Sequence, residues 1–261
     1  MNSAIPRSAD AIRSPESVDL SGVALLLDVD GTLLDIAVTP SDVVVPAMLR
    51  EILGDLIESA GGAVALVSGR RIASLDDLFA PLLTPAIGGH GAEMRVAPGE
   101  PVVETSTAAL DEAIRRELKR LAGVDPRLLL EDKAHSLALH YRLAPERETL
   151  LKIAVREIVA SDPKHDVEVL FGKHVIDVKP THFSKGSAVR DLMRRKPFAG
   201  RKPLFVGDDT TDESVFAIMA DLKGSGFSVG RQIAGTQGTF ASPRDVRSWL
   251  RQIWVHNGSG V

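Results

Sequence analysis

Short apolar runs alternate with longer segments of helical spacing along most of the chain. Four runs end in small or acidic residues, VALLLDVDGT, GAVALVSGR, TPAIGGHGAE and KPLFVGDDTTDE, and a fifth, GFSVG, is shorter. Such runs, bounded by turn residues, are typical of buried strands. The segments between them, such as PAMLREILGDLIESAG, carry apolar residues three and four positions apart, as amphipathic helices do. This alternation predicts an α/β fold with a Rossmann-like, doubly wound parallel sheet that helices cover on both faces.

The middle of the chain follows a different pattern. MRVAPGEPVV predicts a hairpin, SLALHYR alternates with a period of two, and VEVLFGKHVIDVKP predicts two strands joined by a turn. Two amphipathic helices, in TAALDEAIRRELKRLAG and ERETLLKIAVREIVA, lie between these pieces. Together they predict an antiparallel sheet with helices on one face. We expect an inserted α/β cap domain over residues 95–179, and a core domain made of residues 21–94 and 180–261.

Composition narrows the class of protein. The 261 residues are 44% hydrophobic and 25% charged, as in ordinary globular proteins. The net charge of -4 gives no electrostatic reason to expect nucleic acid or an anionic membrane as partner. The absence of cysteine excludes disulfides and thiolate chemistry and fits a reducing compartment, so we expect a cytoplasmic protein. Residues 1–20 are polar and predict a disordered tail.

Acidic residues follow two of the apolar runs. Asp28 and Asp30 are separated by one residue, so on a strand their carboxylates point to the same side and repel unless a cation lies between them or one is protonated. Asp208, Asp209 and Asp212 follow another run. Acids at two strand ends of one parallel sheet can converge on a hard divalent ion such as Mg²⁺. A simple turn after the strand and a helix N-cap remain alternatives.

Two further residues suit an anion site. Ser68 follows a third apolar run, where its hydroxyl could bind a phosphate oxygen. Lys185 begins the helix expected in SKGSAVR, so its ammonium and the helix amide groups could both face an anion. A helix cap for Ser68 and a solvated surface lysine at position 185 are the structural alternatives.

In this order, the four pieces resemble the motifs of the haloacid dehalogenase superfamily of phosphatases. DVDGT matches the first motif, Ser68 the second, Lys185 the third and GDDTTD the fourth. The resemblance implies that Asp28 attacks phosphorus to give an aspartyl phosphate, and that Asp30 protonates the leaving oxygen and then activates water. It also implies Mg²⁺ bound by Asp28, Asp208 and the backbone carbonyl of Asp30. Ser68 and Lys185 would bind the phosphate oxygens.

The same resemblance gives supporting roles to four more residues. It implies that Asp212 positions Lys185 or a metal-bound water, and that Gly31 and Thr32 let the backbone turn away from the phosphate. Asp209 belongs to the fourth motif, and we expect it to support the site. The insertion between the second and third motifs resembles the superfamily's α/β cap found in sugar phosphatases.

A closer resemblance, which covers nearly all of the chain after the tail, is to the trehalose-6-phosphate phosphatases. It rests on VSGR, GGHGAE, KAHSLALHYR, GKHVIDVKP, SKG and GDDTTDE. It implies magnesium-dependent hydrolysis of trehalose 6-phosphate to trehalose and phosphate, the last step of trehalose biosynthesis. The residues that it implies as substrate contacts are Arg70, His90, Glu93, Lys133, His140, Arg142, Lys173 and Asp177. Asp177 stands where relatives commonly carry glutamate. With no glycosyltransferase segment, the chain is expected to depend on a separate trehalose-phosphate synthase.

Other interpretations remain open at this point. Another sugar phosphate, of the sucrose phosphate or mannosyl-phosphoglycerate type, is a possible substrate, and a phosphomutase or a non-catalytic sugar-phosphate-binding domain are further alternatives. His140 and Tyr141 could pack against the cap helices, Lys133 and Lys173 could be solvated loop lysines, and Arg142 could be a structural ion-pair partner. If the cap closes over the site, we expect hinges near residues 96–99 and 179–183.

Overall fold

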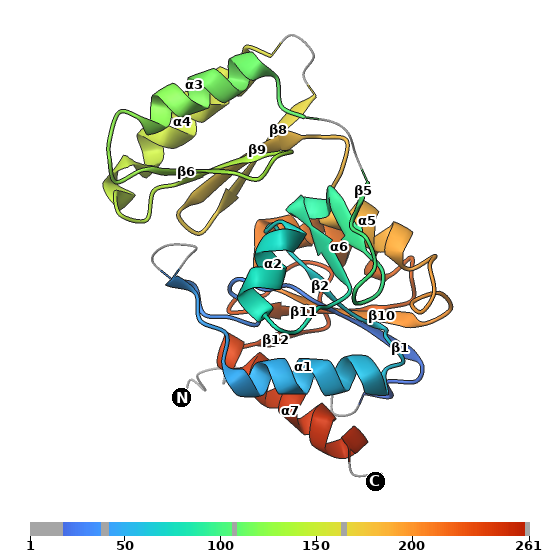
Figure 1. The fold of residues 1–261 in the computed structure, drawn as a ribbon. Coiled ribbons are helices and arrows are strands. Elements are labelled where there is room, and N and C mark those ends of the chain that lie inside the picture. Colours follow the sequence, from blue (N-terminus) through green and yellow to red (C-terminus); the bar gives the residue numbers. More distant parts are fainter. Residues whose placement is uncertain (1–17, 38–41, 106–108, 163–165, 259–261) are drawn as a thin grey trace, which may run out of the picture.

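A computed structural model describes residues 18–37, 42–105, 109–162 and 166–258 (Figure 1). In this part of the chain, eight strands form the larger sheet in the order β12-β11-β10-β1-β2-β3-β4-β5. Pairing is parallel from β12 to β3 and antiparallel from β3 to β5. The strands are β1 (Val23–Leu27), β2 (Val64–Val67), β3 (Ala86–Gly88), β4 (Glu93–Arg95), β5 (Val103–Glu104), β10 (Lys202–Gly207), β11 (Ser225–Val229) and β12 (Gly238–Phe240).

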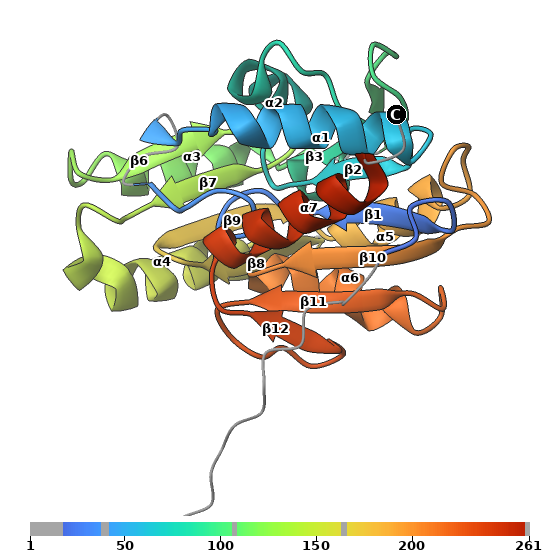
Figure 2. The ribbon, with the colours of Figure 1, turned by 90° about the horizontal axis from the view of Figure 1, so that it is seen from below.

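Helices cover both faces of the larger sheet, which confirms the doubly wound prediction. One face packs against α1 (Ala47–Ser59), α2 (Ile72–Phe79) and α7 (Pro243–Gly258), of which α1 and α7 lie side by side in Figure 2. The opposite face packs against α5 (Lys185–Leu192) and α6 (Glu213–Met219). The central strand β1 serves both layers, because Leu25 and Leu27 point to the first set of helices and Leu26 to the second.

The smaller sheet is antiparallel, with the strand order β6-β7-β9-β8 among the described residues. Its strands are β6 (Leu129–Asp132), β7 (Leu137–His140), β8 (Val167–Gly172) and β9 (Val175–Pro180). Helices α3 (Glu112–Ala122) and α4 (Glu148–Ala160) pack on one face, as the sequence predicted, and Figure 1 shows them on the side away from the larger sheet. The other face is therefore left to meet the larger domain. We call this smaller sheet with its two helices the cap.

Two expectations differ from the structure. The strands of the MRVAPGEPVV hairpin, β4 and β5, extend the larger sheet and take no part in the cap sheet. The predicted tail falls mostly on residues 1–17, which lie outside the described residues, but Val18 and Leu20 are buried in the core. Strand pairing shows two separate sheets but does not fix the residues at which one domain ends and the next begins. The predicted domain boundaries at residues 95 and 179 therefore stay a prediction. No helix in the described ranges is long and apolar enough to span a membrane.

Shortening the side chain of Leu26 tests the packing of the central strand. Leu26 is fully buried, so Leu26→Ala should lower the free energy of unfolding by about 2–5 kcal/mol, from lost burial and the remaining cavity. Urea denaturation measures this loss. Leu150→Ala on α4, where the side chain is 67% exposed, is the control and should change stability by less than about 0.5 kcal/mol. Equal losses for both variants would contradict this account of the core.

Candidate active site

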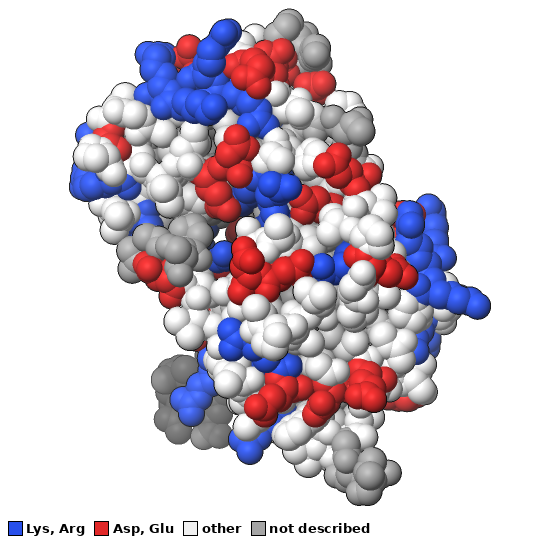
Figure 3. Space-filling model, in the orientation of Figure 1, with Lys and Arg blue, Asp and Glu red and all other residues white. Residues whose placement is uncertain are grey.

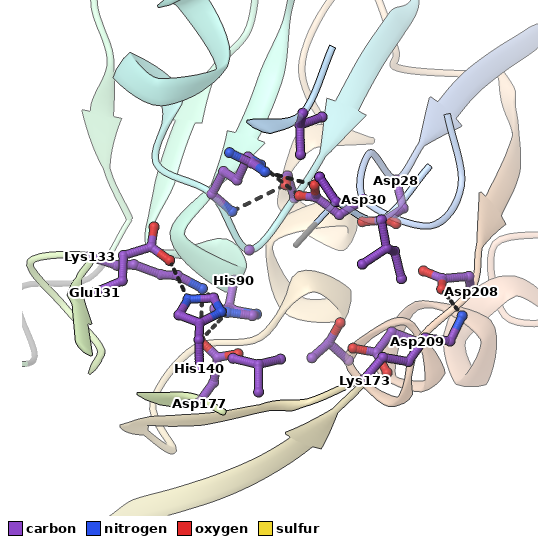
Figure 4. Close-up of a pocket in the computed structure, with 18 of the residues that line it drawn as sticks. Asp28, Asp30, His90, Glu131, Lys133, His140, Lys173, Asp177, Asp208 and Asp209 are labelled. Carbon is purple, nitrogen blue, oxygen red and sulfur yellow. Dashed lines mark hydrogen bonds and ion pairs between the residues drawn. The ribbon is translucent and has the colours of Figure 1, made fainter. Parts of the chain in front are cut away.

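Carboxylates gather where two adjacent parallel strands end. Asp28 directly follows β1 and Asp208 directly follows β10, and the two strands pair in parallel register up to Leu27 and Val206. Both aspartates are buried, and Figure 4 shows them at the same edge of the sheet. Ligand oxygens of Asp28, Asp208 and Asp212 all lie within 4.8 Å of one another. The carboxyl ends of the strands thus bring together acids that are about 180 residues apart in sequence.

The two acids of the first motif face different partners. The chain leaves β1 before Asp28, so the two-residue alternation of a strand does not carry over to Asp30. The carboxylate of Asp30 instead accepts hydrogen bonds from Nε and Nη2 of Arg70, at 2.6 and 2.8 Å. Gly31 makes this turn possible: its φ is +84°, and a Cβ there would lie 2.2 Å from Oδ2 of Asp208.

Lys185 holds the buried acids together. It is the first residue of α5, and its Nζ donates to Oδ1 of Asp28 and to Oδ1 of Asp212, both at 2.8 Å. Burial alone would lower the pKa of Lys185, but Asp212 and Asp28 raise it above its usual value, so the ammonium is charged. The other oxygen of Asp212 accepts from the backbone N–H groups of Asp208 and Asp209. Asp212 therefore binds both Lys185 and the backbone of the fourth motif.

Of the remaining motif residues, Ser68 and Asp209 line the pocket and Thr32 does not. Ser68 is buried, lines the pocket, and accepts a hydrogen bond from the backbone N–H of Arg70 through its Oγ. Asp209 also lines the pocket, and its side chain accepts from the backbone N–H of Thr210. Thr32 is buried outside the pocket lining, and its Oγ1 has no hydrogen-bond partner among the described residues. The alternatives of a surface lysine at position 185 and a simple helix cap at Ser68 are wrong.

The donor set of the acidic cluster fits a metal ion. Burial raises the pKa of Asp208 to about 6, although Lys173 opposes the shift, and burial followed by Asp212 raises that of Asp28 well above its usual range. Oδ1 of Asp208 is buried and has no hydrogen-bond partner in the described part of the chain. Carboxylate oxygens with excess negative charge are suitable ligands for a hard divalent cation. Asp28, Asp208 and Asp212 could therefore bind a metal.

Cap residues form the opposite wall of the pocket. Lys133, at the end of β6, donates to Oδ1 of Asp177 on β9 at 2.8 Å, and Nε2 of His90 lies 3.2 Å from the same oxygen. All three side chains are buried. Burial alone would raise the pKa of Asp177, but Lys133 and His90 hold it well below its usual range. This contact joins the cap to the larger domain, because His90 belongs to the short η2 turn (Gly89–Gly91) after β3.

Two further pairs complete the cap wall. Nε2 of His140 lies 2.9 Å from Oε2 of Glu131, and Arg142 donates to the main-chain carbonyl of Lys173. Nζ of Lys173 lies 2.7 Å from Oδ2 of Asp208, which ties the β8–β9 turn to the acidic cluster. Charged side chains of both signs lie along the junction of the two lobes in Figure 3. Glu131, on β6, also lines the pocket, and no motif in the sequence singled it out.

Most of the predicted substrate contacts meet in one pocket. Those that line it are Arg70, His90, Lys133, His140, Arg142, Lys173 and Asp177. Glu93 lies outside the lining, where its carboxylate accepts from the backbone N–H of Ile72 and from Nε of Arg71 at the start of α2. Tyr141 packs in the cap core, whereas Lys133 is buried rather than solvated. Substrate contact by these residues stays a prediction.

Known structures share this architecture. The C-terminal domain of C. albicans trehalose-6-phosphate phosphatase superposes with a TM-score of 0.79 at 23% identity, over 90% of this chain and 92% of that one. A structure described as a trehalose-6-phosphate phosphatase related protein superposes with a TM-score of 0.68 at 22% identity, over 92% of this chain and 100% of that one. This chain thus shares its fold with both of these structures.

The sequence comparisons define the family. The trehalose-phosphatase family model matches residues 26–245. A probable trehalose-phosphate phosphatase of Sinorhizobium fredii is 38% identical, over 92% of this chain and 91% of the relative. The trehalose-6-phosphate phosphatase of Escherichia coli is 37% identical, over 91% of this chain and 89% of the relative. The chain belongs to the trehalose-phosphatase family.

Burial of His90 predicts a pH-dependent stability. Burial lowers its pKa below the usual 6.5, although Asp177 opposes the shift. In the unfolded chain, His90 takes up a proton as the pH falls through about 6.5, whereas in the folded protein it does so only at a lower pH. Acidification therefore favours the unfolded state, and the stability of the folded protein falls. Between about pH 7.5 and about pH 5.5, the wild type should lose more unfolding free energy than His90→Gln, as urea titrations at each pH would measure. His256→Gln, on an exposed part of α7, should follow the wild type. Equal slopes for the wild type and His90→Gln would contradict the prediction.

Proposed function

We propose that this protein hydrolyses trehalose 6-phosphate to trehalose and inorganic phosphate with Mg²⁺ as cofactor. The observation that carries the proposal is the pocket itself: the Asp28 carboxylate and the Lys185 ammonium lie on one wall, and a hydrogen-bonding cap surface lies opposite. Family membership and the names of the relatives from S. fredii and E. coli support the choice of substrate. This reaction is the last step of trehalose biosynthesis.

In the proposed mechanism, Asp28 is the nucleophile. Lys185 fixes its Oδ1, which leaves Oδ2 to attack phosphorus and form an aspartyl phosphate. Lys185 and Ser68 stabilise the charge that develops on the phosphate oxygens. Arg70 holds the Asp30 carboxyl at the pocket, where Asp30 protonates the departing sugar oxygen and then takes a proton from the hydrolytic water.

Magnesium would be held by Asp28 and Asp208, with the Asp30 backbone carbonyl as the further ligand that the family resemblance implies. When bound, the ion supplies positive charge that offsets the phosphate and the two carboxylates. Asp212 lies near enough to contribute, but both of its oxygens already accept hydrogen bonds, from Lys185 and from two backbone amides. We therefore assign Asp212 to positioning Lys185.

The cap supplies sugar recognition in this proposal. A disaccharide presents many hydroxyl groups, which polar side chains with fixed geometry select by hydrogen bonding. Lys133, Asp177, His90, His140 and Arg142 line the pocket opposite the carboxylates. We also propose a cytoplasmic location, which the absence of cysteine supports. The alternatives from the sequence, another sugar phosphate or a non-catalytic binding domain, have no separate support in the pocket.

Phosphate release tests the substrate and the nucleophile together. We expect the protein with Mg²⁺ to prefer trehalose 6-phosphate over sucrose 6-phosphate, glucose 6-phosphate and an aryl phosphate. Asp28→Asn should abolish turnover of every substrate, because an amide oxygen is a poor nucleophile. Asp221→Asn, on an exposed ion pair with Arg190, is the matched control and should remain active. Equal activity across the panel would refute the specificity, and an active Asp28→Asn would refute the mechanism.

Thermal unfolding tests magnesium binding without any turnover. An ion that binds only the folded state at about 100 times its Kd stabilises that state by about 2.7 kcal/mol, so Mg²⁺ should raise the Tm of the wild type. Asp208→Asn should lose most of this rise, because it removes a ligand and a charge. Asp221→Asn should keep the rise. An unchanged rise in Asp208→Asn would show that Mg²⁺ binds elsewhere.

A further inference from the structure

Lys179 is a buried cation with no role in the mechanism above. It is the penultimate residue of β9, and only 2% of it is exposed. Its Nζ donates to the main-chain carbonyls of Pro180, at 2.9 Å, and of Phe183, and it pairs with Glu168 on β8 at 2.5 Å. An ammonium has three N–H donors, and each of these donors has a partner here. The aromatic ring of Phe183 also lies beneath it, with its centroid 4.4 Å from Nζ.

The carbonyls that Lys179 binds lie in the connection from the cap to the larger sheet. Pro180 is the last residue of β9, and residues 181–184 join it to α5, where the chain can be followed in orange in Figure 1. Asp177 precedes Lys179 by two residues and faces the same side of β9, whereas Lys185 follows the connection directly. Along the chain, Lys179 therefore lies between a cap residue of the pocket wall and the lysine that binds Asp28.

The far end of the connection is held independently of Lys179. Ser184 caps α5 through reciprocal hydrogen bonds with Ser187. A Cβ on Gly91 would lie only 2.3 Å from the carbonyl oxygen of Ser184, so the connection packs directly on the η2 backbone. Loss of the Lys179 ammonium should therefore loosen the cap end and leave Lys185 in place.

Core packing does not require a charge at this position. Burial lowers the pKa of Lys179, and Glu168 opposes that shift only in part. Burying the charged ammonium therefore costs free energy. The arrangement gives a reason for keeping it: an apolar side chain could fill the space but could not bind two main-chain carbonyls of the connection. The ring of Phe183, in the connection, also makes an edge-on contact with His135 of the β6–β7 turn.

We propose that Lys179 is a positioning residue that fixes the cap sheet over the catalytic carboxylates and thereby sets selectivity for a sugar phosphate over a small phosphate ester. The proposal rests on the proposed function. A small ester needs only groups of the larger domain, such as Asp28, Ser68 and Lys185. A disaccharide phosphate must in addition meet the cap residues at the correct distance, and a misplacement of about 1 Å can cost about 10²-fold in rate.

The test compares two substrates in two matched lysine variants of the full chain with Mg²⁺. Lys179→Met keeps the apolar stem and removes the charge, and Lys119→Met does the same at an exposed position of α3. We expect the ratio of kcat/KM for trehalose 6-phosphate to that for p-nitrophenyl phosphate to fall about tenfold or more in Lys179→Met. The ratio should be unchanged in Lys119→Met and partly restored in Lys179→Arg. A ratio within about twofold of the wild type in Lys179→Met, whatever its Tm, overturns the proposal, because a purely structural role would lower stability alone.

Two further measurements keep the result decisive. Glu168→Gln removes the negative charge that faces the ammonium and should shift the ratio in the same direction by a smaller factor. This variant provides the test if Lys179→Met does not fold. Hydrogen exchange of the amides of residues 181–183 needs no substrate, and should be faster in Lys179→Met than in the wild type or Lys119→Met. Unchanged exchange overturns the proposal. If the wild type does not hydrolyse trehalose 6-phosphate, the proposed function is refuted. In that case, faster hydrogen exchange in Lys179→Met would still support the anchoring of the connection by Lys179.

Discussion

Electrostatic repulsion between buried carboxylates is the constraint on which the site depends. Asp28, Asp208 and Asp212 converge at the carboxyl edge of the larger sheet, where burial and the neighbouring carboxylates disfavour the charged forms of Asp28 and Asp208. Lys185 offsets part of this charge by binding two of them, and its place at the start of α5 adds the helix amide groups. The close approach of Gly31 to Asp208 leaves no room for a side chain in the turn. The excess negative charge that remains is what makes the cluster a suitable cation site.

The junction between the cap and the larger sheet is polar for a related reason. Asp177 is buried as an anion because Lys133 and His90 both face its Oδ1, and these contacts cross from the cap to η2. Lys173 makes a second crossing to Asp208. Hydrogen bonds of this kind are directional, so they hold the two parts in one relative position while leaving groups that a polar ligand can engage. An apolar junction would have closed the pocket against a sugar.

The sequence predicted the layers of the fold better than the directions of individual side chains. Apolar runs and helical spacing identify β1 and its neighbours because these strands are buried on both faces. Local patterns cannot show which sheet a hairpin joins; here β4 pairs with β3 and β5 pairs with β4, so the hairpin extends the larger sheet. The motifs located Asp28, Ser68, Lys185 and Asp208. They could not show that Glu93 turns toward α2, because that depends on a helix N-terminus elsewhere in the fold.

Alternation along β9 separates two tasks within one strand. Ile176 and Val178 pack beneath the cap helices, whereas Asp177 and Lys179 face the opposite side, toward the pocket and the connection to α5. A substitution on the pocket side therefore leaves the hydrophobic core of the cap intact, and a repacking of the core leaves the pocket chemistry intact. Such a strand lets ligand preference diverge among descendants of one ancestral cap without requiring a new fold.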